Sequence, residues 1–192
     1  PVFPPKIKCS SFFTFWARFS QVLFFAIANN SACKATVFTP LDYRSHTFGE
    51  MRWTIAQWFE KRWWKRYLKN RSVEDYLEWK KSYWKKFLST MQLDIPIYAR
   101  ILDAGCGPAG IFIALQGKVT ACDPLLLSYE KLPHFSIRQY PNVDFKAITI
   151  ESLPFDSAYD MVFCLNVINH VQDMRASLDA LIKAMDHNAQ LI

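Results

Sequence analysis

The segment ILDAGCGPAG, Ile101–Gly110, decides the fold of this 192-residue chain. Its three glycines have the spacing G-x-G-x-x-G, and they follow a short apolar run that predicts a buried strand. Glycine adopts positive φ and has no Cβ, so this spacing suits a tight turn whose backbone closely approaches a ligand. Because a turn without a ligand can have the same spacing, the glycines alone leave the function open.

Strand and helix patterns alternate through residues 96–192. We expect strands at 100–103, 118–123, 143–150, 159–166 and from 189, with helices at 110–116, 125–135 and 174–186. A series of this kind predicts the α/β class, with a doubly wound, Rossmann-like parallel sheet. The pattern stops as a fifth strand begins, so we expect the sheet to be incomplete at its C-terminal end.

Amphipathic helices are expected to precede this sheet, in a basic aromatic segment at residues 51–95. The segment holds eleven Lys and Arg against five Asp and Glu, and six of the seven tryptophans. Apolar and basic side chains fall on opposite arcs of two helices, the second with Ser72 as its N-cap. We favour packing of the aromatic arc against the sheet domain, as a cover over the cofactor. Peripheral contact with a membrane through residues 51–90 is the alternative, and nucleic acid is the least favoured partner.

The first 50 residues form an atypical apolar leader. The leader is rich in Phe, but Arg18 and Gln21 interrupt it, so it does not read as a spanning helix. Two interpretations stay open: an export signal, or sequence that is not native to the protein, since regular patterning begins at Met51. Five cysteines without a C-x-x-C pair favour reduced thiols in a cytoplasmic protein and give no sign of a metal site.

Asp103 narrows the choice of ligand for the glycine loop. A carboxylate would repel the pyrophosphate of a nicotinamide dinucleotide, whereas it would attract a cationic methionine group. Asp123, at the end of the second expected strand, could bind ribose hydroxyls of either cofactor. The charge of Asp103 therefore favours S-adenosyl-L-methionine. A nicotinamide-dependent oxidoreductase and a catalytically dead binding protein remain as alternatives.

The glycine loop, the motif ACDP (121–124) and the segment ESLPFDSAYDMVFCLNVINHV (151–171) together resemble class I S-adenosylmethionine-dependent methyltransferases. The resemblance is to the ubiquinone-biosynthesis-like small-molecule group, covers about residues 96–192, and is that of a C-terminally truncated member. It implies methyl transfer to an unidentified small-molecule acceptor. The cofactor-binding residues that it implies are Asp103, Gly105, Cys106, Gly107, Asp123, Pro124, Ile150, Glu151 and Asn166. The family often has an acid where Thr149 stands, so Glu151 or a backbone carbonyl would take the adenine amine.

His170 is the candidate general base. Transfer of an activated methyl group depends mainly on alignment, which can supply roughly 7–11 kcal/mol, and a base is needed only when the acceptor must lose a proton. His170 follows the fourth expected strand, near the expected transfer pocket, although a packing role is the simpler interpretation. His134 and His187 are expected at the surface, and Cys106 is expected to be a small loop residue whose backbone N–H matters.

Overall fold

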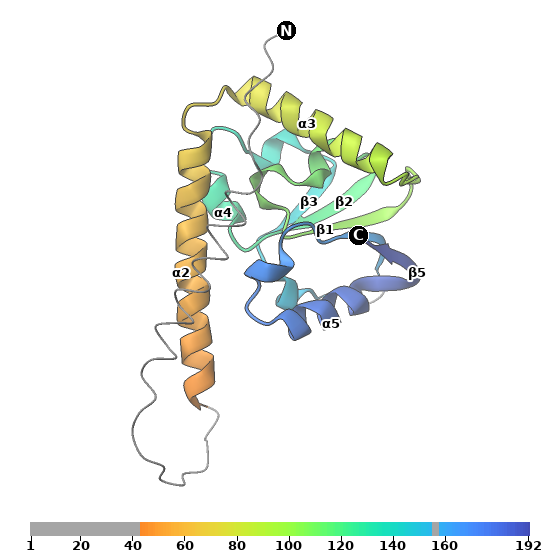
Figure 1. Ribbon diagram of the computed structural model, residues 1–192. Coiled ribbons are helices and arrows are strands. Elements are labelled where there is room, and N and C mark those ends of the chain that lie inside the picture. The colour runs from red at the N-terminus through yellow and green to blue at the C-terminus, as the bar shows by residue number, and fades with distance from the viewer. Residues whose placement is uncertain (1–42, 155–157) are drawn as a thin grey trace, which may run out of the picture. The chain divides into compact units, whose positions relative to one another are not determined.

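The computed structural model describes residues 43–154 and 158–192 (Figure 1). Residues 1–42 of the predicted leader therefore lie outside the described residues. A long helix begins at Tyr43 and runs through Met51 without a break. The main elements are α2 (Tyr43–Leu68), α3 (Val73–Thr90), β1 (Arg100–Ala104), β2 (Lys118–Cys122), α4 (Leu126–Tyr129), β3 (Val143–Lys146), β4 (Tyr159–Phe163), α5 (Met174–Ala184) and β5 (Met185–Leu191). None of the helices among these residues is long and apolar enough to cross a bilayer.

The five strands form one parallel sheet in the order β3-β2-β1-β4-β5. This is the strand order of a doubly wound sheet, with the reversal of winding direction beside β1. The predicted Rossmann-like fold is therefore confirmed. The fifth strand is longer than expected: β5 begins at Met185, directly after α5, and pairs with β4 through a register shift.

Helices cover both faces of the sheet, with α3 on one side and α5 on the other (Figure 1). Successive residues of β1 alternate between the two layers, as a strand requires. Ile101 packs in the core that contains Trp84 of α3, whereas Leu102 packs in the core that contains Leu181 of α5. The indole Nε1 of Trp84 also donates a hydrogen bond to the carbonyl of Ala109, at 3.0 Å. The aromatic arc of α3 thus packs on the sheet domain, as we favoured from the sequence.

The predicted helix at 110–116 does not form. Two short 3-10 turns replace it, η1 (Gly107–Ala109) and η2 (Ile111–Ala114). Gly110 is extended and Gly117 has φ 87°, so the segment between them is too short to sustain an α-helix. The predicted helix at 125–135 likewise shrinks to α4, because Pro133 disfavours helical geometry at the residue before it.

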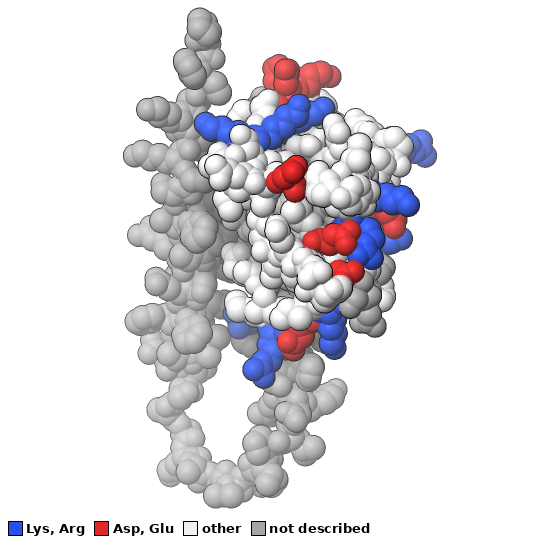
Figure 2. All heavy atoms as spheres, turned by 90° about the vertical axis from the view of Figure 1, so that its right-hand side faces the viewer, with Lys and Arg blue, Asp and Glu red and all other residues white. Residues whose placement is uncertain are grey.

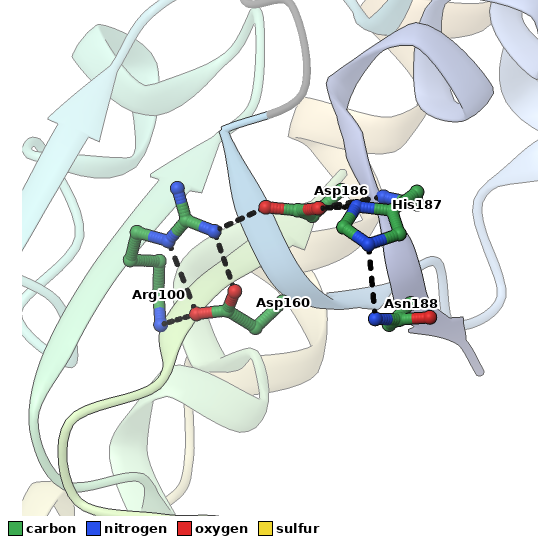
Figure 3. Close-up of polar contacts among 5 residues, drawn as sticks. All are labelled: Arg100, Asp160, Asp186, His187 and Asn188. Carbon is green, nitrogen blue, oxygen red and sulfur yellow. Dashed lines mark hydrogen bonds and ion pairs between the residues drawn. The ribbon is translucent and has the colours of Figure 1, made fainter.

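A network of exposed charges ties together the amino-terminal edge of the sheet (Figure 3). The Arg100 guanidinium, at the start of β1, forms ion pairs with Asp160 of β4 at 2.5 Å and with Asp186 of β5 at 2.8 Å. The Arg100 backbone N–H also donates to Asp160, at 2.8 Å. These contacts fasten the two later strands to the centre of the sheet.

Candidate cofactor site

The candidate site lies at the carboxyl ends of β1 and β2. Asp103 is the fourth residue of β1 and pairs with Ala121, and Asp123 follows the last residue of β2. Because parallel strands end at the same edge, the two carboxylates converge beside the glycine loop. Both are buried, with 3% and 7% of their surface exposed. The sequence-based placement of these two residues is therefore correct.

Asp103 is held by the backbone that follows the glycine loop. Its Oδ2 accepts a hydrogen bond from the Phe112 N–H at 3.0 Å, and a Cβ on Gly110 would lie only 2.5 Å from the same oxygen. Burial raises the pKa of the Asp103 carboxyl to about 7, because water no longer stabilises its charge. The positive charge of Lys80 on α3 opposes this rise without cancelling it.

Asp123 is bound to the loop itself. Its Oδ1 accepts from the Leu125 N–H at 2.7 Å, and its Oδ2 accepts from the Gly107 N–H at 3.0 Å. Burial raises its pKa to about 7 as well, and the negative charge of Glu60 adds to the rise. Asp123 and Asp103 are therefore two neighbouring acids whose ionised forms a nearby cation would stabilise.

The N–H groups of the glycine loop are used inside the protein. Gly105 and Cys106 both donate to the carbonyl of Cys122, at 2.8 and 3.0 Å, while Gly107 donates to Asp123. The Cys106 N–H thus fixes the loop on β2. Burial also raises the pKa of the Cys106 thiol well above its ordinary value, which keeps the thiol neutral and unsuited to nucleophilic attack.

Two glycines are required by the conformation of the loop. Gly105 has φ 69° and Gly107 has φ 56°, in the left-handed region that favours glycine. A Cβ on Gly105 would also meet the side chain of Val167 at 2.1 Å. A Cβ on Gly107 would point toward the ring of Trp64, 3.8 Å away. Any side chain at position 105 would therefore collide with Val167, whereas a side chain at position 107 would point toward α2.

Helix α2 adds residues that the sequence analysis did not select. Glu60 Oε1 accepts a hydrogen bond from the hydroxyl of Tyr129 at 3.3 Å, which joins α2 to α4 beside Asp123. One turn further along α2, Trp64 makes an edge contact with the Tyr129 ring, with centroids 6.3 Å apart. The two helices accordingly stand side by side in Figure 1. The inner side of α2 thus covers the glycine loop.

The two residues expected along the adenine, Ile150 and Glu151, differ in their surroundings. Ile150 is buried in a short turn after β3, and Glu151 beside it turns toward the start of α5. Its Oε1 accepts from the N–H groups of Gln172 and Asp173, at 2.8 and 3.2 Å. Burial raises the pKa of Glu151, but these N–H donors outweigh it and lower the pKa overall. Glu151 therefore has a structural role at the start of α5, and Pro124 directly follows Asp123.

Asn166 and His170 follow β4, on the same edge of the sheet. Asn166 is exposed and has φ 57°, the left-handed conformation that asparagine tolerates. His170 is half-buried, and burial lowers its pKa while the negative charge of Glu60 raises it. His134, predicted at the surface, is instead buried, and its Nε2 lies 3.0 Å from the carbonyl of Arg71. That prediction was wrong because His134 packs under the connection between α2 and α3.

The site fits a cationic cofactor better than a phosphate. None of the described salt bridges involves Asp103 or Asp123, so each buried carboxylate can accept a positive partner. A pyrophosphate would meet two buried acids and no α-helix N-terminus after the loop. A cationic group such as the methionine ammonium of S-adenosylmethionine could pair with these carboxylates, and ribose hydroxyls could donate to Asp123.

Comparisons with known proteins agree with this chemistry. Residues 102–191 match a family described as a methyltransferase domain. The chain is 36% identical over 95 residues to a ubiquinone biosynthesis O-methyltransferase of Rickettsia conorii, and 36% identical over 92 residues to that of Rickettsia prowazekii. The matches cover 48% and 46% of this chain but only 33% and 36% of the two enzymes.

A methyltransferase of known structure shows a partial likeness to the chain. It is 1,6-didemethyltoxoflavin-N1-methyltransferase of Burkholderia thailandensis, solved with S-adenosylhomocysteine bound. The identity is 14%, the TM-score is 0.48, and the overlap covers 82% of this chain and 66% of that one. The fold assignment rests on the strand order and not on this likeness.

Proposed function

We propose that the chain is a class I S-adenosylmethionine-dependent methyltransferase, which binds S-adenosylmethionine and transfers its methyl group to a small-molecule acceptor, because residues 102–191 match a methyltransferase domain. The observation that carries the proposal is the pair of buried carboxylates, Asp103 and Asp123, at the carboxyl edge of the sheet. Both lack a cationic partner among the described salt bridges. A positively charged donor supplies that partner.

Each residue of the proposed donor site has a defined task. Asp103 attracts the methionine ammonium, and Asp123 exchanges its hydrogen bond to Gly107 for bonds from the ribose hydroxyls. The freed Gly107 N–H can then bind the methionine carboxylate. Ile150 offers an apolar wall for the adenine, and Asn166 lines the path to the acceptor.

The chain's contribution to the reaction is alignment and proton transfer. When bound, S-adenosylmethionine supplies a methyl group on a sulfonium that is already activated toward attack. The carboxyl edge holds the donor in place, which turns a bimolecular step into an aligned one. His170 accepts the proton that a hydroxyl acceptor loses, and the negative charge of Glu60 stabilises the resulting imidazolium.

We also propose that the protein works in the cytoplasm. Cys106, Cys122 and Cys164 are free thiols in the described part of the chain, which supports a reducing compartment.

Calorimetry with S-adenosylmethionine and, separately, with NADH tests the proposal on the full chain. We expect S-adenosylmethionine to bind in the micromolar range and NADH not to bind. Binding of NADH in place of S-adenosylmethionine would favour an oxidoreductase, and binding of neither would favour a protein with a dead cofactor site. Either result overturns the proposal.

A further inference from the structure

Helix α2 has an outer face that is apolar at one end and basic at the other. At 100° per residue, one arc of the helix collects residues from about five turns. These residues, here called the outer face, are Met51, Ile55, Trp58, Arg62, Lys65 and Arg66 of α2, together with Lys69, which directly follows the helix. The first three are large apolar side chains with 53%, 44% and 51% of their surface accessible.

The outer face has one sign of charge. Between Met51 and Lys69 the only acidic residue is Glu60, and its carboxylate is turned inward to the hydroxyl of Tyr129. Arg62 lies over the ring of Trp58, 5.5 Å from its centroid, so the apolar and basic halves meet without a gap. The side of the molecule away from α2 shows acidic and basic side chains intermixed (Figure 2).

This combination fits the surface of an anionic bilayer. Such a surface presents negative headgroups and an apolar layer in one plane, and helices that lie in it insert Trp and aliphatic side chains beside Lys and Arg. A second copy of the chain would bring like charges together. A nucleic acid would pair with the cations but would leave Met51 and Ile55 in water.

We propose that the outer face of α2 binds an anionic membrane surface, with the helix lying in the plane of the bilayer. This inference goes beyond methyl transfer and does not depend on it. Its geometric consequence follows from the opposite side of α2, where Trp64 stands against Gly107. Docking of the outer face places the carboxyl edge of the sheet next to the lipid surface, within reach of an apolar acceptor dissolved there.

Vesicle sedimentation with the full chain tests the inference. We expect binding to vesicles of equal parts phosphatidylcholine and phosphatidylglycerol, weak binding to pure phosphatidylcholine, and loss of binding as salt rises. Trp58→Ala should weaken binding by roughly tenfold. The matched control is Trp79→Ala, because Trp79 is a similarly exposed tryptophan, 43% accessible, on α3. Its binding should stay within about twofold of the parent chain.

A second pair of variants tests the charges. Lys65→Glu with Lys69→Glu should abolish binding to anionic vesicles, whereas Lys81→Glu with Lys85→Glu on α3 should leave most of it. Equal losses in the α2 and α3 variants, or binding of single-stranded DNA without binding of vesicles, would overturn the inference. Calorimetry with S-adenosylmethionine on each variant reports the donor site separately, and we expect an unchanged affinity for Trp58→Ala.

Discussion

The two edges of the sheet treat the same kind of side chain in opposite ways. At the amino edge, Asp160 is exposed and pairs with Arg100, and the hydrogen bonds from that guanidinium lower the pKa of Asp160 to about 2. At the carboxyl edge, Asp103 and Asp123 are buried, and burial raises their pKa values to about 7. The carboxyl group of Asp160 is thus far more acidic than those of Asp103 and Asp123.

This difference in burial and pairing is the one expected between a carboxylate that only stabilises the fold, such as Asp160, and carboxylates that bind a ligand, the role proposed for Asp103 and Asp123. At the amino edge the charge of Asp160 is balanced by Arg100 and stays in water, so it costs the fold little. At the carboxyl edge the fold bears the desolvation cost of two acids that none of the described salt bridges offsets, and the charge of Lys80 compensates only part of this cost for Asp103. Such an arrangement weakens the free protein and strengthens its complex with a positively charged ligand.

The largest effect should be a pH dependence of stability set by the carboxyl edge. Folded Asp103 and Asp123 keep their protons to about pH 7, while the unfolded chain releases them near pH 4. The folded state therefore binds more protons in this window, so these two groups lower stability as pH rises from 4 to 7. For Asp103 the loss should be roughly 2–4 kcal/mol.

Urea unfolding at pH 5 and at pH 8 measures this effect. Asp103→Asn, which does not titrate, should be less sensitive to pH than the parent chain by the amount given above. Asp160→Asn is the matched control from the amino edge, and its difference between the two pH values should equal that of the parent. An unchanged difference in Asp103→Asn would show that the carboxyl is ionised in the folded protein.

The next largest effect should be on the affinity for S-adenosylmethionine, which a change at the carboxyl edge should lower and a change at the amino edge should not. Asp123→Asn removes a charged acceptor for ribose hydroxyls, which is worth about 1.5–3 kcal/mol and corresponds to a loss of roughly 10- to 100-fold in affinity. Asp160→Asn should bind S-adenosylmethionine like the parent chain. Calorimetry in two buffers of different ionisation enthalpy should also detect proton release at pH 7, because the bound cation favours ionised carboxylates.

A different result for either variant would break the comparison. Equal affinity in Asp123→Asn and the parent chain would remove Asp123 from the donor site. Uptake of protons on binding, in place of release, would mean that the ligand is not a cation next to these acids.

The sheet and its two acids could be predicted because they follow from local patterns. Alternating strands and helices fix a parallel sheet, and the ends of parallel strands place Asp103 and Asp123 together whatever surrounds them. The helix at 110–116 was wrong for an equally local reason, since glycines bound a segment too short to sustain it. The order of the strands was therefore predictable from the sequence, whereas the length of the short helix after the glycine loop was not.

The α2 side of the site could not be predicted in this way. The predicted apolar arc of the helix was right for Leu68, which is buried, but wrong for Ile55, which is 44% exposed. It did not indicate that Glu60 and Trp64 would lie against the glycine loop. That contact depends on how α2 docks on the sheet domain, which no local pattern fixes. Val167 behind Gly105 is a similar case, because the two residues are far apart in sequence and meet only through the strand order.

Glu60 of α2, which lies beside Asp123, offers a smaller test of the carboxyl edge. Its charge raises the pKa of His170 and of Asp123, so Glu60→Gln should lower both. Proton NMR of the imidazole resonances follows His170 directly, independent of activity. Glu78→Gln, which alters an exposed acid on α3, is the matched control and should leave the His170 titration unchanged. A shift in both variants would indicate a general effect of net charge.

The smallest effect should come from the amino edge itself. Asp160→Asn removes an ion pair that is largely in water, so the melting temperature should fall by only about 2–4 °C at neutral pH. The pKa of Asp160 is lowered, so its contribution is present above about pH 4 and is lost as pH falls toward 2. The parent chain and Asp160→Asn should therefore converge in stability at low pH, measured by thermal unfolding monitored by circular dichroism. Because the carboxyl-edge acids give the opposite slope between pH 4 and 7, a maximum of stability near pH 4, with a fall on either side of it, is the signature of the two edges acting together. A variant gap that persists at pH 2 would assign the loss to packing of β4 and β5 and not to the charge of Asp160.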